Sequence, residues 1–213
     1  MQDKVDAQIL FRIVSHQLDS LFPIFGEIGS LSIQNISIAL QRARNCIAKI
    51  KAANNGFEYL NSSHYATFLY FLSHELGQHE NGIKDATRIF LLNKALNGID
   101  LFYEIQMPEV FSVAHTVGMV FAKATYGSHC VFHQGCTVGR NLDTRPILEP
   151  GVVLYPHSSV IGSCLVRKNT VIAPGVHLVN MDTPGDCIVF NGENGRPIFK
   201  PIVEQYAHRY LAP

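Results

Sequence analysis

The stretch LEPGVVLYPHSSVIGSCLVRKNTVIAPGVHL, residues 148–178, decides the fold, because a large apolar residue returns at every sixth position. The positions in this run are Leu148, Leu154, Val160, Val166, Ile172 and Leu178. The same step of six connects an earlier run, made of Val120, Tyr126, Phe132 and Val138. Between the two runs the step is ten, so four extra residues must leave the pattern near 139–147.

A six-residue rhythm is the signature of a parallel β-helix, in which each hexad supplies one short strand and one turn. Three hexads close a triangular coil, and the large residue points inside onto its equivalents in the next coil. Small or β-branched residues that suit a tight corner stand four positions later in most hexads: Ala124, Cys130, Cys136, Val152, Ser158, Cys164, Thr170 and Val176. A β-sandwich is the alternative, but it predicts a period of two, which is weak here. The expelled loop is expected to carry function, as loops commonly do.

Residues 1–100 are typical of helix instead. One helix is expected from Val5 through VDAQILFRIVSHQL, and a second from Ser32 as its N-cap to 54–56. HYATFLYFLSHEL and IKDATRIFLLNKALNG predict two more, the last stopped by Gly98. Phe68, Leu69, Phe71 and Leu72 belong to apolar stripes that short helices cannot hide alone.

The chain therefore divides into a helical N-terminal domain (1–105), a β-helix (106–190) and a C-terminal tail (191–213), which is an α+β organisation.

Charge and composition exclude several functions. Lys+Arg and Asp+Glu are both 17 of 213 residues, so the zero net charge offers no electrostatic footprint for nucleic acid or an anionic membrane. Charged residues make up 16%, against roughly 25% in a typical domain, so we expect an oligomer to cover part of the surface.

We expect a cytoplasmic protein, because MQDKVDAQIL is no signal peptide and the five cysteines show no CxxC spacing. No apolar run reaches the roughly 18 residues of a membrane span.

Histidines provide the first candidates for chemistry. His115 and His133 are separated by the length of three hexads, so in coils of that length they would stack about 4.8 Å apart on one edge. An imidazole is the usual base for removing a proton from a hydroxyl. The alternative is a surface or turn histidine satisfied by a backbone carbonyl.

Two other chemistries are less favoured by the pattern. His129, His157 and His177 fall at scattered phases of the repeat, so no metal is expected. Cys130 and Cys136 are alternatives as acyl-accepting nucleophiles, but both fall in the small-residue column, which indicates packing.

Four segments resemble the hexapeptide-repeat acyltransferases, and among these the serine acetyltransferase family most closely. The segments are AHTVGMVFAKATYG (114–127), FHQGCTVG (132–139), DTRPILEPGVV (143–153) and NGENGRPIFKP (191–201). The resemblance implies a left-handed parallel β-helix that forms a homotrimer, with active sites between neighbouring subunits and acetyl-CoA as the acyl donor. The helices are then expected either to pack against the β-helix or to join two trimers into a hexamer.

Residue by residue, the resemblance places the family's general-base histidine on His115 in the segment HTVG. Its TLGG segment falls on TVGR (137–140), and its DRHP loop falls on DTRP (143–146). The acceptor is assigned to His133, Asp143 and Arg145. Acetyl-CoA is assigned to the coils after the loop, at Gly139, Arg140, His157, Ala173 and Lys200.

The departures from the family lie on the acceptor side. Ala114 stands where the family has an aspartate before the base, and Thr144 and Arg145 replace the arginine and histidine of the loop. The carboxylate that orients the base must then be Glu104 or Glu109, of which Glu104 is preferred.

The sequence therefore predicts an acetyl-CoA-dependent O-acetyltransferase acting on a small hydroxyl-bearing acceptor, L-serine or a serine-like molecule. The altered acceptor side leaves open a sugar or nucleotide-sugar acceptor, acetylated on oxygen or nitrogen, as in surface polysaccharide biosynthesis. A non-catalytic β-helix that serves as an assembly scaffold is the alternative of another class.

Overall fold

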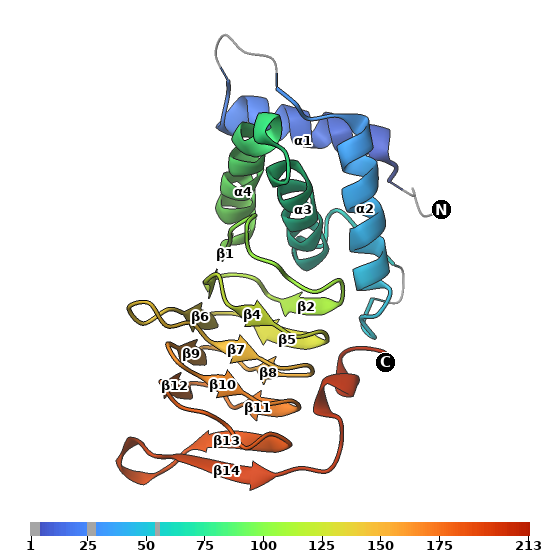
Figure 1. Ribbon diagram of the computed structural model, residues 1–213. Coiled ribbons are helices and arrows are strands. Elements are labelled where there is room, and N and C mark those ends of the chain that lie inside the picture. Colours follow the sequence, from blue (N-terminus) through green and yellow to red (C-terminus); the bar gives the residue numbers. More distant parts are fainter. Residues whose placement is uncertain (1–4, 25–28, 54–55) are drawn as a thin grey trace.

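A computed structural model describes residues 5–24, 29–53 and 56–213 (Figure 1). Within these residues four α-helices come first: α1 (Ala7–Leu21), α2 (Ile33–Ile47), α3 (Ser62–Gly77) and α4 (Ile83–Asn97). The strands that follow are β1 (Ile99–Leu101), β2 (Phe111–Ala114), β3 (Met119–Phe121), β4 (Thr125–Tyr126), β5 (Cys130–His133), β6 (Thr137–Gly139), β7 (Ile147–Leu148), β8 (Val153–Leu154), β9 (Ser159–Ile161), β10 (Leu165–Val166), β11 (Thr170–Ile172), β12 (His177–Val179), β13 (Cys187–Asn191) and β14 (Pro197–Pro201). Short 3-10 turns lie at Glu80–Gly82, Glu193–Gly195 and Tyr206–Arg209. The predicted order of helices followed by a β-helix is confirmed.

Local sequence explains where the helices begin and end. Ser32 caps α2, because its hydroxyl accepts a hydrogen bond from the N–H of Asn35 while the side-chain oxygen of Asn35 accepts one from the N–H of Ser32. Gly98 ends α4 in the left-handed conformation, with a φ of 65°. Both residues stand where the sequence predicts a cap.

The second helix is shorter than predicted. It ends at Ile47, and Ile50 then pairs with Leu211 in an isolated antiparallel bridge. This contact with the far end of the chain is invisible to local periodicity. Of the predicted stop at 54–56, residues 54 and 55 lie outside the described residues.

Three sheets form the sides of a prism. Their strand orders are β1-β3-β6-β9-β12, β10-β7-β4 and β14-β13-β11-β8-β5-β2. Leu148 pairs in parallel with Val166, three hexads later along the chain, which is the predicted coil length. Tyr126 pairs with Leu148, and the separation of these two residues exceeds three hexads by four residues. These four residues leave the stack between β6 and β7. The expelled loop is confirmed, and Figure 1 shows it projecting beside β6.

The predicted inward column is buried except at its first position. Val120 is 44% exposed, whereas Phe121 is 4% exposed and points inside with Phe132. The spacing between the inward residues Phe121 and Tyr126 is one residue shorter than the hexad step. The corner between β3 and β4 therefore lacks one residue of a full hexad. The assignment of Val120 to the column was therefore wrong by one residue.

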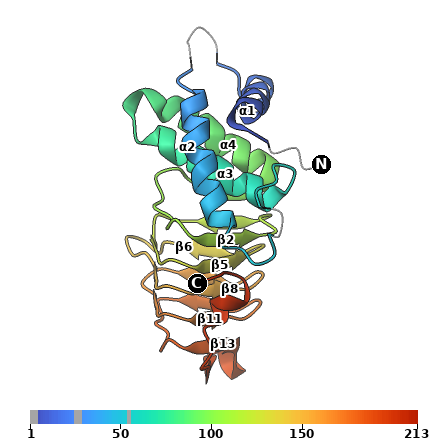
Figure 2. The same ribbon diagram turned by 90° about the vertical axis from the view of Figure 1, so that its right-hand side faces the viewer.

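The two domain boundaries differ from the predicted ones. β1 already pairs in parallel with β3, so the solenoid begins at Ile99 rather than at residue 106. At the other end, β14 pairs antiparallel with β13, so residues 197–201 of the predicted tail close the six-stranded sheet. Residues 202–213, here called the strap, then run back along this sheet toward α2 (Figures 1 and 2).

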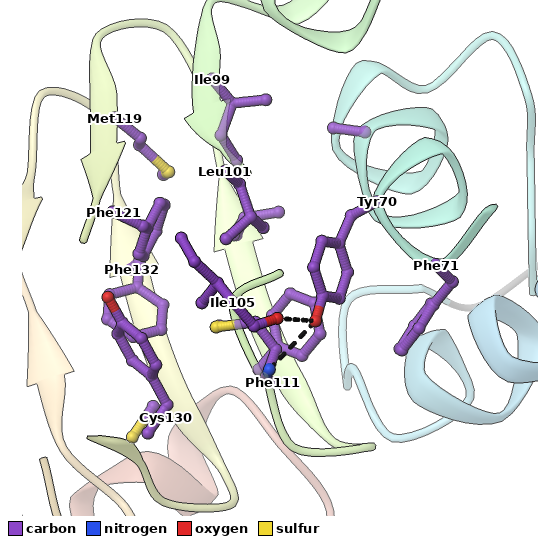
Figure 3. Packing of buried hydrophobic residues seen from close by; sticks show 14 of the residues in the cluster. Tyr70, Phe71, Ile99, Leu101, Ile105, Phe111, Met119, Phe121, Cys130 and Phe132 are labelled. Atoms are coloured by element: carbon purple, nitrogen blue, oxygen red, sulfur yellow. Dashed lines mark hydrogen bonds between the residues drawn. The ribbon is translucent and has the colours of Figure 1, made fainter. Parts of the chain in front are cut away.

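The helices cap the solenoid and share one hydrophobic core with it. The Tyr70 hydroxyl in α3 donates to the carbonyl of Ile105 at 2.7 Å and accepts from the N–H of Met107 at 3.0 Å. Its ring packs edge-on against Phe111 of β2 (Figure 3). The predicted packing of the helices against the β-helix is confirmed, and their predicted role in a hexamer stays a prediction. Across the described ranges, none of the helices combines the length and apolar content needed to span a bilayer.

Candidate active site

Two edges of the prism carry most of the residues that the sequence singles out. The base edge is the corner between the six-stranded and five-stranded sheets, formed by residues 115–118, 134–136, 155–158 and 173–176. The loop edge is the corner between the five-stranded and three-stranded sheets, and it carries the expelled residues 140–146.

His115 opens the first corner of the base edge. Its backbone adopts a left-handed φ of 54° and its side chain is exposed. The rest of this corner is fixed to the end of α4, because Thr116 Oγ1 donates to the carbonyl of Asn97 at 2.6 Å and the N–H of Gly118 donates to the carbonyl of Gly98 at 2.9 Å. Ala114 pairs with His133 and Val120 pairs with Thr137, so the corner between Ala114 and Val120 holds two more residues than the corresponding corner of the next coil. His115 therefore stands out from the stack.

His133 follows at the end of β5. The predicted stacking of His115 directly over His133 was wrong, because the first coil is one residue longer than three hexads and Ala114 pairs with His133 instead. The two imidazoles are nevertheless close enough to interact. Burial lowers the pKa of His133, and a positive charge on His115 lowers it further. His133 is therefore a neutral imidazole at neutral pH.

Aromatic residues surround His133 on the outer face of the sheet. Its ring stacks on Tyr155 with centroids 5.0 Å apart and an interplanar angle of 2°, and it meets the ring of Tyr210 edge-on at 5.4 Å. Among the described residues, His133 Nε2 and the side-chain oxygen of Gln134 are buried without a hydrogen-bond partner. These two atoms, and His129 Nε2 just before β5, are thus left without a hydrogen bond inside the described chain.

Farther along the base edge lie two residues assigned to acetyl-CoA. His157 is exposed in a left-handed conformation, with a φ of 60°, and its ring fills the space that a side chain at Gly135 would need. Ala173 follows one coil later, and a Cβ placed on Gly175 would meet nothing within 4 Å. At these two corners the edge is therefore open, with small residues beside the imidazole of His157.

The loop edge holds a tight two-residue turn. Asn141 and Thr144 exchange backbone hydrogen bonds of 3.1 and 3.0 Å, so the turn presents exposed Asp143 at its tip. Arg140 and Arg145 flank this turn and are also exposed. The expected acceptor residues of the loop and the expected acetyl-CoA residues Gly139 and Arg140 therefore lie together.

The two edges do not meet within one chain. They lie at opposite ends of β6, whose three residues span about 10 Å at roughly 3.3 Å per residue. No hydrogen bond or ion pair among the described residues connects Asp143 or Arg145 to His115. A site that uses both edges needs a second copy of the chain.

The two expected orienting carboxylates have other partners. Glu104 forms an ion pair with Lys123, and Glu109 forms one with Arg42 at 2.7 Å. In the part of the chain that the structure describes, neither of them hydrogen-bonds to His115. Each would have to exchange its partner to hold the imidazole.

Comparison with solved structures identifies the architecture. The serine acetyltransferase of Vibrio cholerae aligns with a TM-score of 0.68 at 14% identity, over 97% of this chain and 78% of that chain. Isoform 3 from Entamoeba histolytica, solved with cysteine, gives 0.62 at 18% identity, over 91% and 73%. The Neisseria gonorrhoeae enzyme, solved with serine, gives 0.62 at 18%, over 94% and 78%.

This chain has the fold of the serine acetyltransferases. No family model matches the sequence, and no curated protein does. Identities of 14–18% establish the serine acetyltransferase fold, and the chemistry has to be argued from the residues themselves.

The cysteines of this serine acetyltransferase fold are free thiols inside the core. Burial raises the pKa of Cys130 to about 12, and burial also raises that of Cys136. A thiolate nucleophile requires the opposite shift, so both cysteines act as packing residues. Among the described residues no group of three or more histidine, cysteine or acidic side chains is arranged to hold a metal.

The sequence analysis missed three residues at the base edge. Gln134 and Tyr155 belong to two of its corners, and Tyr155 follows His133 by one coil plus the expelled loop. That spacing could have placed Tyr155 beneath His133. Tyr210 comes from the strap, outside the hexad repeat, and no periodic signal could have found it.

Proposed function

We propose that this chain transfers an acetyl group from acetyl-CoA to the hydroxyl of a small acceptor, with His115 as general base. The observation that carries the proposal is the enlarged first corner, which presents an exposed imidazole at the head of an open edge. The serine acetyltransferase fold supports the reaction class, and the choice of His115 as the base comes from the sequence resemblance.

The chemistry requires one proton acceptor at this position. His115 removes the hydroxyl proton as the acceptor oxygen attacks the thioester carbon. The C–O bond forms, the C–S bond breaks, and the imidazolium returns its proton to the departing CoA thiolate. A carboxylate, Glu104 or Glu109, holds the imidazolium after releasing its present cation. Backbone N–H groups near Gly139 of a neighbouring copy stabilise the oxyanion.

The separation of the edges supports a homotrimer. In a closed ring of three copies, the base edge of one protomer faces the loop edge of the next if the five-stranded sheets turn toward the threefold axis. Arg145 of the neighbour then reaches the acceptor bound at His115, where its planar guanidinium pairs with a carboxylate or phosphate. A hexamer joined through the helices remains part of the proposal.

Acetyl-CoA fits the length of the six-stranded sheet that borders the base edge. Lys200 lies on β14, five strands beyond β2 in the same sheet, which is about 24 Å at roughly 4.8 Å per strand. That span suits an extended pantetheine arm with its diphosphate. We assign the arm to His157 and Ala173, and the phosphates to Lys200 and to Arg140 of the neighbour.

The proposed acceptor is L-serine or a serine-like molecule. Two of the similar solved structures are serine acetyltransferases in complex with serine or with cysteine. A sugar or nucleotide sugar is the second candidate, because Ala114 and Arg145 depart from the family at the acceptor side. A thiol-release assay with L-serine, sugars and nucleotide sugars distinguishes them.

The first prediction tests the base. His115→Ala should reduce CoA release by about 10²- to 10⁴-fold, because proton abstraction contributes that much to such reactions. The matched control is His16→Ala, which removes an exposed histidine from α1. Normal thiol release by His115→Ala would refute the assignment. Absence of acetyl-CoA binding in calorimetry would favour the scaffold alternative.

A further inference from the structure

The strap, residues 202–213, is anchored along the outer face of the six-stranded sheet. Its buried residues Ala207 and Leu211 belong to a cluster with three valines of successive coils, Val131, Val153 and Val171. At its start the N–H of Tyr206 donates to Asn169 Oδ1 at 2.8 Å.

The end of the strap is fixed to the helical cap. The N–H of Lys51 donates to the carbonyl of Tyr210 at 2.8 Å, and the N–H of Ala212 donates to the carbonyl of Lys49 at 2.7 Å. The strap is therefore held at both ends, and the position of Tyr210 follows from these contacts.

Tyr210 completes a cage around His133. Its hydroxyl lies 2.6 Å from that of Tyr155, which also lies 2.9 Å from that of Tyr206. Tyr155 supports one face of the imidazole, and Tyr210 closes its edge. Tyr206 shares the hydroxyl network but packs edge-on against Tyr155 rather than against His133.

Two polar atoms at this corner, one of them inside the cage, point to a ligand. His133 Nε2 and the side-chain oxygen of Gln134 are buried and have no partner among the described residues. A buried polar atom without a partner is costly, so such atoms are usually paired in native proteins. His133 also lies close enough to His115 for the charge of one imidazole to affect the other.

We propose that the strap is part of the acceptor site, in which Tyr210 and Tyr155 are positioning residues that fix His133. An acceptor that displaces the atoms now covering them then donates hydrogen bonds from a hydroxyl or an amine to His133 Nε2 and to the Gln134 oxygen. This inference rests on the acetyl transfer proposed above. It adds a C-terminal segment that the hexad repeat does not include.

The test compares three variants of the full-length protein. Tyr210→Ala removes the ring that touches His133, Tyr210→Phe keeps the ring and removes the hydroxyl, and Tyr206→Ala is the control from the same strap. We expect Tyr210→Ala to raise the acceptor KM by about five- to tenfold, the worth of one aromatic contact. The KM for acetyl-CoA should change less than twofold. Tyr210→Phe should recover most of the loss, and Tyr206→Ala should leave both constants within twofold.

A second measurement needs no activity. The side-chain proton resonances of His133, assigned with a His133→Gln variant, should carry ring-current shifts from Tyr155 and Tyr210. Tyr210→Ala should move them toward ordinary histidine positions, and Tyr206→Ala should not. Unchanged His133 resonances with an unchanged acceptor KM would overturn the inference, as would equal losses in Tyr210→Ala and Tyr206→Ala. If no acceptor is acetylated at all, the proposed function fails, while the resonances still show whether the strap fixes His133.

Discussion

His157 occupies a backbone conformation that neighbouring coils give to glycine. Gly135 and Gly175 stand at the corresponding corners with φ values of 69° and 67°, and His157 has a φ of 60°. A side chain in this conformation costs roughly 1–2 kcal/mol relative to glycine. The imidazole at this corner therefore carries a cost in stability, which agrees with its proposed contact with acetyl-CoA.

Two substitutions separate the backbone cost from the loss of the imidazole. His157→Gly should be more stable than His157→Ala by about 1 kcal/mol, because glycine alone is relaxed at this φ. Thermal unfolding should show a Tm about 2–4 °C higher for the glycine variant. Both variants should raise the KM for acetyl-CoA equally. A more stable alanine variant would contradict the strained corner.

At single residues, the sequence predicts the exposure of His115, the proposed base, better than it predicts the residues around it. His115 belongs to the segment HTVG, which can be compared directly with a family motif. Its exposure requires only that the corner contain extra residues. The relation of His115 to His133 depends on the greater length of the first coil, and one additional residue has no signature in a six-residue rhythm. Tyr210 reaches His133 through tertiary contacts of the strap, which no local pattern encodes.

Among the elements, the hexads specify the solenoid because each inward residue must fill a narrow core. Burial of an aliphatic side chain contributes about 1.5–3 kcal/mol, so a polar residue in this column would be selected against on stability alone. For the same reason, Phe121 takes the inward position in place of Val120 where a corner is one residue short. The rhythm thus predicts that a column exists more reliably than where it starts.

The cap of α2 gives a prediction at this scale. Ser32→Ala removes the hydroxyl that accepts from Asn35, and it should lower stability by about 1 kcal/mol and Tm by about 2–4 °C. Ser37→Ala is the matched control, because Ser37 is exposed inside the same helix and its hydroxyl only donates back to Ile33.

The control should be neutral or slightly stabilising, since alanine is the better helix former. Equal effects of the two substitutions in thermal unfolding would show that Ser32 is not a functional cap.

At the scale of the whole molecule, the expelled loop and the base lie on different edges of one prism. The step of ten reveals the loop, and the register shows that β6 separates it from His115. A single chain can therefore hold only half of the proposed site. The low share of charged residues, 16%, agrees with a surface that is partly covered by other copies.

Mixing two inactive variants tests this division directly. His115→Ala lacks the base, and Arg145→Ala lacks the cation of the loop, which should cost about 10- to 100-fold for a charged hydrogen-bonded contact. If each site joins the base edge of one protomer to the loop edge of the next, trimers reassembled from an equal mixture contain intact sites. In a closed ring, the protomer that supplies the base edge has His115 with a chance of one half, and the next protomer has Arg145 with a chance of one half. About a quarter of the sites are then intact, so about a quarter of wild-type activity should return. Mass measurement should show the trimer in all samples. Activity no higher than the average of the two variants would place both residues in one protomer and rule out the shared site.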